Sequence, residues 1–535
     1  MKKILKLFKT QDKRLKICAL ITALMLAIFN VVGHSINNYY DLREIIGSFG
    51  LGILAIGKVL LYSSIIYFLI IIVMNLIQNS KPQKPKEYKF LTANAKSFLL
   101  SWGIIFILWL PYFLQYYPGL ISDDSIRQMQ QIMGDMNYTE HHPLIHTLII
   151  KIFIDIGNLF NNIVLGISLY SIFQMLAMSA IFAFVVYYLS KKKVPNIIRI
   201  LVVLSFAIYP VHAMYSITMW KDILFGGMIL LYTIWIYEYT QNKEFIEDRK
   251  NIISFIAMTI MIIMLRKNGI IVTLFVVPFL MILRKDKIKK VTLMILSSYV
   301  LYVIINTTLV NIYNADKGEI REALSIPMQQ LARVVKFEGD NLKQEDIEQI
   351  KKFIQSDKIA ELYNPVLSDP IKDCFNSEVF NQNKIEFIGM WFKYFLKYPL
   401  DYVESFLCGS YGYWYPEAKN WVVAIEGNGK SRVGVEPILN TKIIPNIEKI
   451  TIEQRKIPIL FSIGSNVWML IIAFMLCFYK RKYKVLVAFI PSLAIILTSM
   501  ASPVFCEFRY VYGVFTSIPF LLSITYLAIK NQNNV

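Results

Sequence analysis

The chain has 535 residues, of which 56% are hydrophobic and only 17% are charged. This balance excludes an ordinary soluble globular protein and predicts an all-α, polytopic membrane protein. A formal net charge of +19 would favour nucleic acid as a partner of a soluble protein. Here the basic residues lie mainly in short linkers between apolar runs, which is the positive-inside pattern, so we expect no nucleic-acid partner.

The N-terminal residues 1–16 are basic and lead into an apolar run over 17–32. A secretory signal has this shape, but residues 32–38 contain no convincing cleavage site with small residues. We therefore expect an uncleaved first membrane span.

Basic linkers predict the topology of the rest of the chain. Residues 2–16, 81–96, 191–193, 284–290 and 480–484 are expected in the cytoplasm. About twelve spans then fit, with both termini cytoplasmic. The predicted spans are 16–34, 51–77, 97–116, 163–189, 197–213, 221–240, 251–266, 268–283, 291–310, 457–479, 485–501 and 510–529.

The first large outer loop, residues 117–162, is predicted to hold two surface helices. Residues 143–160 are apolar, but a span here would move the basic linker 191–193 to the outside, and Lys151 and Asp155 interrupt the run. Residues 122–134 form the other helix. Ser122 is expected to cap it, with an apolar stripe of Ile126, Met129 and Met133.

Three regions follow from this topology: a transmembrane module over 1–310, an extracytoplasmic and mostly helical domain or cover over 311–456, and C-terminal transmembrane helices over 457–535. The first half of the outer domain, 319–355, is polar and helix-prone. Its second half, 391–415, is rich in Trp and Tyr, which favour the headgroup zone, so we expect it to lie against the outer leaflet. Cys374 and Cys408 both fall in this domain and could pair, whereas the five cysteines show no metal-binding spacing.

Polar residues of several loops gather on the predicted outer face. Two basic residues in one short outer turn run against the positive-inside pattern, which indicates an anionic partner such as a lipid phosphate. A neighbouring carboxylate would serve as general base for an acceptor hydroxyl. The residues concerned are Asp123, Asp124, His141, His142, His146, Trp220, Lys221, Asp222, Arg266, Lys267, Asn268, Glu507, Arg509 and Tyr510.

Structural explanations compete with these functional ones. An acidic residue in the first turn of a helix is favoured by the macrodipole alone, and a lysine at a helix end can extend towards water. Arg509 could simply pair with Glu507 or Asp222. The spacing of His142 and His146 is compatible with a metal, but a third ligand is not evident.

The same residues carry a family resemblance. The run Tyr117-Pro118-Gly119, Asp124-Ser125 and Gln128, followed by His141-His142-Pro143 and His146-Thr147, resembles the first-loop signature of the GT-C glycosyltransferase superfamily, closest to a bacterial subfamily of polytopic proteins. Further pieces agree in order, from about residue 100 to the C-terminus: Trp220-Lys221-Asp222, Leu265-Arg266-Lys267-Asn268-Gly269, the segment 325–333, and Glu507-Phe508-Arg509-Tyr510.

This resemblance implies a polyprenyl-phosphate-linked sugar donor, an inverting single displacement, and a catalytic carboxylate in the first outer loop. Asp124 occupies the matching position and Asp123 ranks second. Lys221, Asp222, Arg266, Lys267, Asn268, Arg509, Tyr510, His142 and His146 become candidates for substrate or phosphate binding. Some members of the superfamily use a divalent ion and others none; Mg²⁺ or Mn²⁺, if used, would be held by Asp124, His142 and His146.

The resulting prediction is a glycosyltransferase of the cell membrane, a hexosyl- or pentosyltransferase of polysaccharide biosynthesis. It would transfer a sugar at the outer face to a cell-envelope glycan, polymer or lipid. Two alternatives stay open. One is a polysaccharide polymerase or ligase that uses lipid-pyrophosphate oligosaccharides. The other is a lipid-linked-sugar transporter or flippase, although transporters usually place charges near the bilayer midplane and show repeated halves.

Overall fold

The computed structural model describes residues 12–79, 92–318, 320–419, 443–444, 462–501 and 506–530, apart from the side chain of Asp123. Within these ranges the regular secondary structure is entirely helical, and β-pairing is limited to isolated bridges. This confirms the predicted all-α class, which follows from the need of backbone groups in a bilayer to bond within their own helix.

Eight helical segments are long and apolar enough to cross a membrane, and a ninth consists of two helices that meet at a bend of 51°. The eight are α2 (Lys13–Tyr39), α4 (Phe49–Asn79), α5 (Ala95–Gln115), α8 (Ile163–Lys191), α11 (Lys221–Gln241), α14 (Ile288–Tyr313) with the turn before it, α25 (Tyr483–Leu486) continuing into α26 (Ile490–Ala501), and η9 (Phe508–Val511) continuing into α27 (Tyr512–Lys530). The bent pair is α9 (Asn196–Ile208) and α10 (Pro210–Ser216).

Three further helices coincide with predicted spans but are shorter. They are α12 (Arg249–Leu265), α13 (Gly269–Leu283) and α24 (Ile463–Tyr479). Each predicted span therefore falls on a helix, whereas the number of twelve crossings stays a prediction.

Several of these helices begin at a polar residue that satisfies a free backbone N–H group. Asn94 accepts from the N–H of Ser97 at the start of α5, and Asn162 accepts from that of Leu165 at the start of α8. A short polar side chain at the edge of an apolar run thus fixes where these helices begin.

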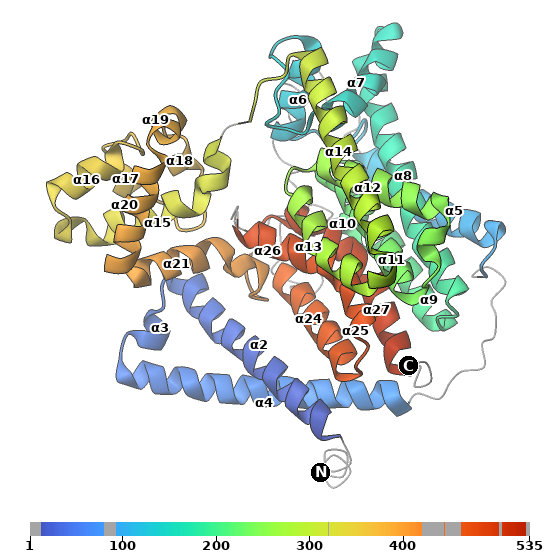
Figure 1. Ribbon diagram of the computed structural model, residues 1–535, viewed down its shortest axis with the longest axis horizontal. Helices are drawn as coiled ribbons and strands as arrows, with labels where there is room; N and C mark the ends of the chain where they lie inside the picture. The colour runs from blue at the N-terminus through green and yellow to red at the C-terminus, as the bar shows by residue number, and fades with distance from the viewer. Residues whose placement is uncertain are drawn as a thin grey trace.

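Helix α11 lies at the centre of the membrane module. It packs against α27, α12 and α8, and 83% of its most apolar 18-residue stretch is buried. The corresponding shares of α4 and α14 are only 22% and 17%, so these two helices lie at the periphery and present most of their apolar surface to the lipid. In Figure 1 the blue helices α2 and α4 cross at the lower edge of the molecule.

Residues 320–410 form a helical domain to one side of the membrane helices, coloured yellow to orange in Figure 1. A separate hydrophobic cluster, drawn from residues 328–402, holds it together. The helices are α15 (Ser325–Glu338), α16 (Gln344–Lys351), α17 (Ile359–Leu362), α18 (Asp369–Lys372), α19 (Ser377–Gln382), α20 (Lys384–Lys397) and α21 (Pro399–Ser410). This domain lies within the region 311–456 predicted as an outer domain or cover, whose residues 319, 420–442 and 445–456 lie outside the described residues.

A buried ion pair joins this domain to the end of α2. The guanidinium of Arg333 on α15 contacts Glu404 on α21 and donates to the carbonyl of Tyr40 at 3.1 Å. The other carboxylate oxygen of Glu404 accepts from the backbone N–H of Leu42 at 2.8 Å. The motif around Arg333 therefore fixes the domain on a membrane helix.

The aromatic stretch 391–415 differs in part from its predicted role. Tyr411, Tyr413, Trp414 and Tyr415 are almost completely buried, because they pack against α2 and α24 within the membrane module. Their rings fill the protein interior, and the exposed apolar surface of this stretch lies earlier in the chain, on α20 and α21. Cys374 donates to the carbonyl of Pro370 and Cys408 to that of Tyr40, so these two cysteines do not pair with each other.

The two predicted surface helices are present as α6 (Asp123–Met133) and α7 (Leu144–Leu159), and α7 is not among the candidate spans. Ser122 stands at the N-cap of α6, but its side chain makes no capping bond; its Oγ instead accepts from the indole N–H of Trp220. Of the expected apolar stripe, Ile126 and Met129 are buried and Met133 is exposed.

Candidate functional site

A short parallel bridge brings the first-loop segment beside the segment before α11. The N–H of Leu120 donates to the carbonyl of Ile217 at 2.8 Å, and the N–H of Met219 donates to the carbonyl of Leu120 at 2.9 Å. The hydroxyl of Ser125 then donates to the carbonyl of Met219. This pairing places the start of α6 against the start of α11, and so brings two of the predicted motifs together.

Glycine is required where the chain enters this bridge. Gly119 has a φ of +138°, and a Cβ atom built there would lie 2.2 Å from the hydroxyl oxygen of Ser171 on α8. The same hydroxyl donates to the carbonyl of Pro118 at 2.9 Å. The Pro-Gly pair of the sequence motif therefore allows the loop to lie directly against α8.

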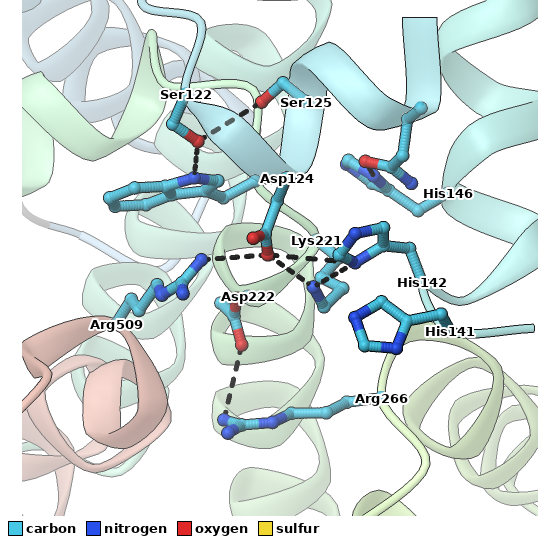
Figure 2. Close-up of polar contacts among 12 residues, drawn as sticks. Ser122, Asp124, Ser125, His141, His142, His146, Lys221, Asp222, Arg266 and Arg509 are labelled. Atoms are coloured by element: carbon cyan, nitrogen blue, oxygen red, sulfur yellow. Dashed lines mark hydrogen bonds and ion pairs between the residues drawn. The ribbon is translucent and has the colours of Figure 1, made fainter. Parts of the chain in front are cut away.

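Asp124 is the centre of the site (Figure 2). Its Oδ2 atom accepts from the ammonium of Lys221 at 2.8 Å and from the guanidinium of Arg509 at 2.9 Å. Nδ1 of His142 lies 3.9 Å from the same oxygen. Four residues from three distant parts of the chain, all predicted as site residues, therefore meet at one carboxylate.

Arg509 is held from several directions. It belongs to the last predicted outer turn, pairs with Glu507, and stacks its guanidinium over the ring of Trp220 at 5.0 Å. The expected structural pairing with Glu507 is thus present, but it coexists with the contact to Asp124. An Arg with several partners keeps donors in a fixed plane, which suits a carboxylate or a phosphate.

A second, deeper ion pair lies below the first in Figure 2. Asp222 is completely buried, and its Oδ1 atom lies 3.3 Å from the guanidinium of Arg266. Arg266 also donates to the carbonyl of Tyr510 at 2.9 Å and lies 4.4 Å from the centre of that ring. The ion pair therefore forms a second layer of contacts below Asp124, made by Asp222, Arg266 and Tyr510. Asp222 is adjacent in sequence to Lys221.

His142 is buried beside these charges. Its Nδ1 atom lies 3.3 Å from the ammonium of Lys221, and its Nε2 atom is buried without a hydrogen-bond partner in the part of the chain that the structure describes. Burial and, next, the nearby Lys221 lower the pKa of His142 to about 3. His142 is therefore neutral at physiological pH and offers an imidazole nitrogen to a polar partner.

Asp124 itself is held as a carboxylate. Burial raises its pKa, but the charges of Lys221 and Arg509 together lower it well below the ordinary value. A carboxylate in this setting is ionised at neutral pH and accepts hydrogen bonds.

His146 has a different place from the one predicted. Its ring is completely buried, with Nδ1 3.0 Å from Oε1 of Gln128 and Nε2 2.8 Å from the hydroxyl of Tyr170. Tyr170 in turn donates to Gln174, whose amide donates to the carbonyls of residues 215, 216 and 218. Both ring nitrogens of His146 are thus used inside the protein, and the ring belongs to a relay of buried polar side chains.

This relay connects the two segments that form the site. Gln128 lies one turn after Asp124 on the same face of α6, and residues 215–218 lead directly to Lys221. Sequence reasoning missed Tyr170 and Gln174. The signal that could have found them is a pair of hydrogen-bonding side chains, spaced four residues apart, inside an apolar span.

The remaining predicted residues lie at the margin or outside the described part. Lys267 is exposed, with its ammonium near Gly318, and Asn268 stands at the N-cap of α13 without a capping bond from its side chain. His141 packs its ring edge against His142 at 4.7 Å. The side chain of Asp123 lies outside the described residues. Among the described residues, no group of three His, Cys, Asp or Glu side chains is arranged to hold a metal ion, and His146 already has partners for both nitrogens.

An apolar cavity of about 790 Å³ lies between α9, α10, α24 and α27. Leu201, Met469, Phe515 and Leu522 contribute to its apolar lining, and Tyr209 and His212 stand at its polar part. Ring contacts link it to the site: His212 packs on Tyr512, Tyr512 on Tyr215, and Tyr215 on Trp220, beneath Arg509. The cavity and the charged site are therefore separated by a layer of aromatic side chains.

Comparison with known proteins gives one match. Residues 133–534 match a family described as a family of unknown function (DUF6020). Searches among curated proteins and among solved structures found no match.

Proposed function

The chain belongs to the family of unknown function DUF6020, and we propose that this member is an integral-membrane glycosyltransferase of the GT-C type. It would transfer a sugar from a polyprenyl-phosphate carrier to a cell-envelope glycan, polymer or lipid. The observation that supports this most is the carboxylate of Asp124 held between Lys221 and Arg509. A base and two cations at one point suit sugar transfer from a phosphate leaving group.

In this reaction the acceptor hydroxyl oxygen attacks the anomeric carbon, and the bond from that carbon to the phosphate oxygen breaks. The hydroxyl proton goes to Asp124. The described contacts of Asp124 all use Oδ2, so we assign the incoming proton to Oδ1. The bonding pair stays on the phosphate oxygen, and its growing charge is stabilised by the remaining donors of Lys221 and Arg509.

The cavity beside the site supports a lipid-linked donor. Its lining is mainly apolar and consists of side chains from helices that pass through the membrane region. A carrier chain in this cavity would extend towards the aromatic layer beneath Arg509. Its phosphate would have to pass the edge of this layer to contact the two cations.

The proposal includes the predicted topology. With twelve crossings and cytoplasmic termini, the loops that carry Asp124, Lys221 and Arg509 lie on the extracytoplasmic side. The reaction would then take place where envelope polymers are assembled.

The test uses purified protein in nanodiscs with a panel of polyprenyl-phosphate sugars and scores the release of free polyprenyl phosphate. We expect release by the wild type and a loss of about 10²–10⁴-fold in Asp124→Asn, the range that general-base catalysis contributes. Both proteins are run with and without a divalent cation.

Other outcomes would replace the proposal. Release from pyrophosphate carriers alone would assign the protein to the polymerases or ligases. Counterflow of a labelled lipid without covalent product would assign it to the transporters. Near-normal turnover by a folded Asp124→Asn protein would reject Asp124 as the base.

A further inference from the structure

Helix α20 has two apolar faces, and only one of them is used inside the protein. Phe387, Met390 and Tyr394 point into the core of the helical domain and are at most 3% exposed. On the other face Ile385 is 89% exposed and Leu396 is 65% exposed. The exposed stripe recurs at helical spacing and continues onto α21, through Ile385, Ile388, Phe392, Phe395, Leu396, Leu400 and Val403.

A contiguous exposed apolar stripe of this size marks a contact surface. Its position relative to the membrane follows from the ion pair at the end of α2. Glu404, one residue after Val403, bonds the N–H of Leu42 and the guanidinium of Arg333, which also donates to Tyr40. Since α2 is a membrane span that ends at Tyr39, the stripe ends, at Val403, close to the level where that span leaves the bilayer.

The surroundings at this level are those of a membrane interface. Tyr39, Tyr40 and Phe49, around the turn between α2 and α4, are 44%, 40% and 87% exposed. Along α20, Lys397 lies beside the stripe with its ammonium over the ring of Tyr398. Lys393 lies over the ring of Tyr394 and pairs with Asp346 at 2.7 Å. An exposed apolar stripe with lysine at its flank is typical of a helix that lies at the headgroup boundary.

We propose that α20 and the start of α21 dip into the lipid headgroup layer around the end of α2, with the stripe Ile385–Val403 buried among the upper acyl chains. The occupant of this face is the bilayer itself. The contact holds the helical domain at a fixed height above the membrane module. This inference does not depend on the reaction proposed above, because it concerns only where the domain lies.

The test is photo-crosslinking of the full-length protein in phospholipid nanodiscs. The photoreactive residue p-benzoylphenylalanine replaces Ile388 or Phe392 in the stripe. In a third protein it replaces Asp357, whose side chain is 92% exposed in the same domain but lies in a polar stretch. After irradiation, phospholipid adducts are counted by mass spectrometry of the peptides.

We expect adducts at positions 388 and 392 in at least tenfold excess over position 357. Equal yields at the three positions, or no lipid adduct at 388 and 392, would overturn the proposal. A crosslink from 392 to another protein chain in place of lipid would also overturn it. The readout needs no substrate, so its failure is distinct from a failure of the proposed function.

Discussion

The ammonium of Lys221 donates a 2.8 Å hydrogen bond to Oδ2 of Asp124, although the two residues are 97 positions apart in the chain. The side chains are 13% and 22% exposed, so the pair is shielded from water on most sides. Attraction between such charges is stronger than at an open surface, and the geometry depends on the bridge between residues 120 and 218. The pair therefore reports whether the first loop and α11 are correctly joined.

Replacing Lys221 by methionine keeps the length of the side chain and removes its charge. We expect kcat for polyprenyl-phosphate release to fall about 10²–10³-fold, as for the loss of one donor to a developing oxyanion. A Lys221→Arg variant, which keeps the charge, should retain more activity than Lys221→Met. Steady-state kinetics in nanodiscs decide this; equal kcat in wild type and Lys221→Met would show that Lys221 does not contact the leaving group.

Replacing Arg333 alone or Glu404 alone should destabilise the protein more than replacing both residues together. These side chains are 2% and 8% exposed, so loss of Arg333 leaves the buried carboxylate of Glu404 without its cation, at a cost of about 3–5 kcal/mol. Loss of Glu404 leaves Arg333 with Asp401, 3.5 Å from its Nε atom, as its remaining acidic partner. We expect Arg333→Met and Glu404→Leu each to lower the thermal midpoint in detergent, and the double variant to recover most of the loss. A double variant as unstable as the sum of the singles would mean that the two charges are not coupled.

His146 should make the protein less stable as the pH falls from 7 to 5. Burial and, next, nearby Lys221 lower its folded pKa to about 3, whereas an unfolded histidine titrates near 6.5. Below about pH 6.5 the unfolded chain binds a proton that the folded one does not, so unfolding is favoured, by about 2 kcal/mol at pH 5 relative to pH 7. His142, with a similarly lowered pKa, adds to this effect.

The carboxylate of Asp124 does not contribute to this loss of stability between pH 7 and pH 5. Its folded pKa lies below the ordinary value, so the stabilisation that it provides is lost only at more acidic pH. Thermal midpoints of the wild type and of His146→Gln at pH 5, 6 and 7 test the assignment. The variant should lose less stability than the wild type over this interval. Identical losses would show that His146 is already protonated in the folded protein or accessible to water.

Gly119→Ala should destabilise the protein and reduce activity, because the new Cβ atom would meet the hydroxyl of Ser171 and the carbonyl of Ile217. Two other glycines serve as controls that separate the effect of the close contact from the effect of the positive φ. Gly134 has a φ of +87° but open space around its Cβ position, and Gly103 has open space without a positive φ. We expect the thermal midpoint to fall most in Gly119→Ala, less in Gly134→Ala, and least in Gly103→Ala. A Gly119→Ala protein as stable as Gly103→Ala would contradict the close approach to α8.

Several residues of the candidate site could be predicted from the sequence. Four residues stood out as ionisable groups at the ends of apolar runs: Asp124, Lys221, Arg509 and His142. Desolvation of such groups is costly, so their presence there indicates a function. The structure brings these four together. Local hydropathy and charge were sufficient here, because each residue is unusual in its own segment.

The role of His146 could not be predicted in this way. Its spacing from His142 allowed a shared ligand, whereas its ring is bonded to Gln128 and Tyr170 on two other helices. The same holds for Ser122, whose position predicted a helix cap but whose hydroxyl accepts from Trp220. A polar side chain can bond either to a neighbour in the sequence or to a residue distant in the sequence. A sequence pattern alone does not show which of these hydrogen bonds forms.

The sequence by itself determined that the chain is a helical membrane protein, where its apolar helices lie, and which polar residues interrupt them. These properties depend on hydropathy and helix capping, which act over a few residues. Only the tertiary structure decided that the carboxylate of Asp124 pairs with both Lys221 and Arg509. It also decided that His146 belongs to an internal hydrogen-bond network and that one apolar face of α20 is exposed. Such relationships depend on how helices pack side by side, where a displacement of one turn exchanges every partner of a side chain.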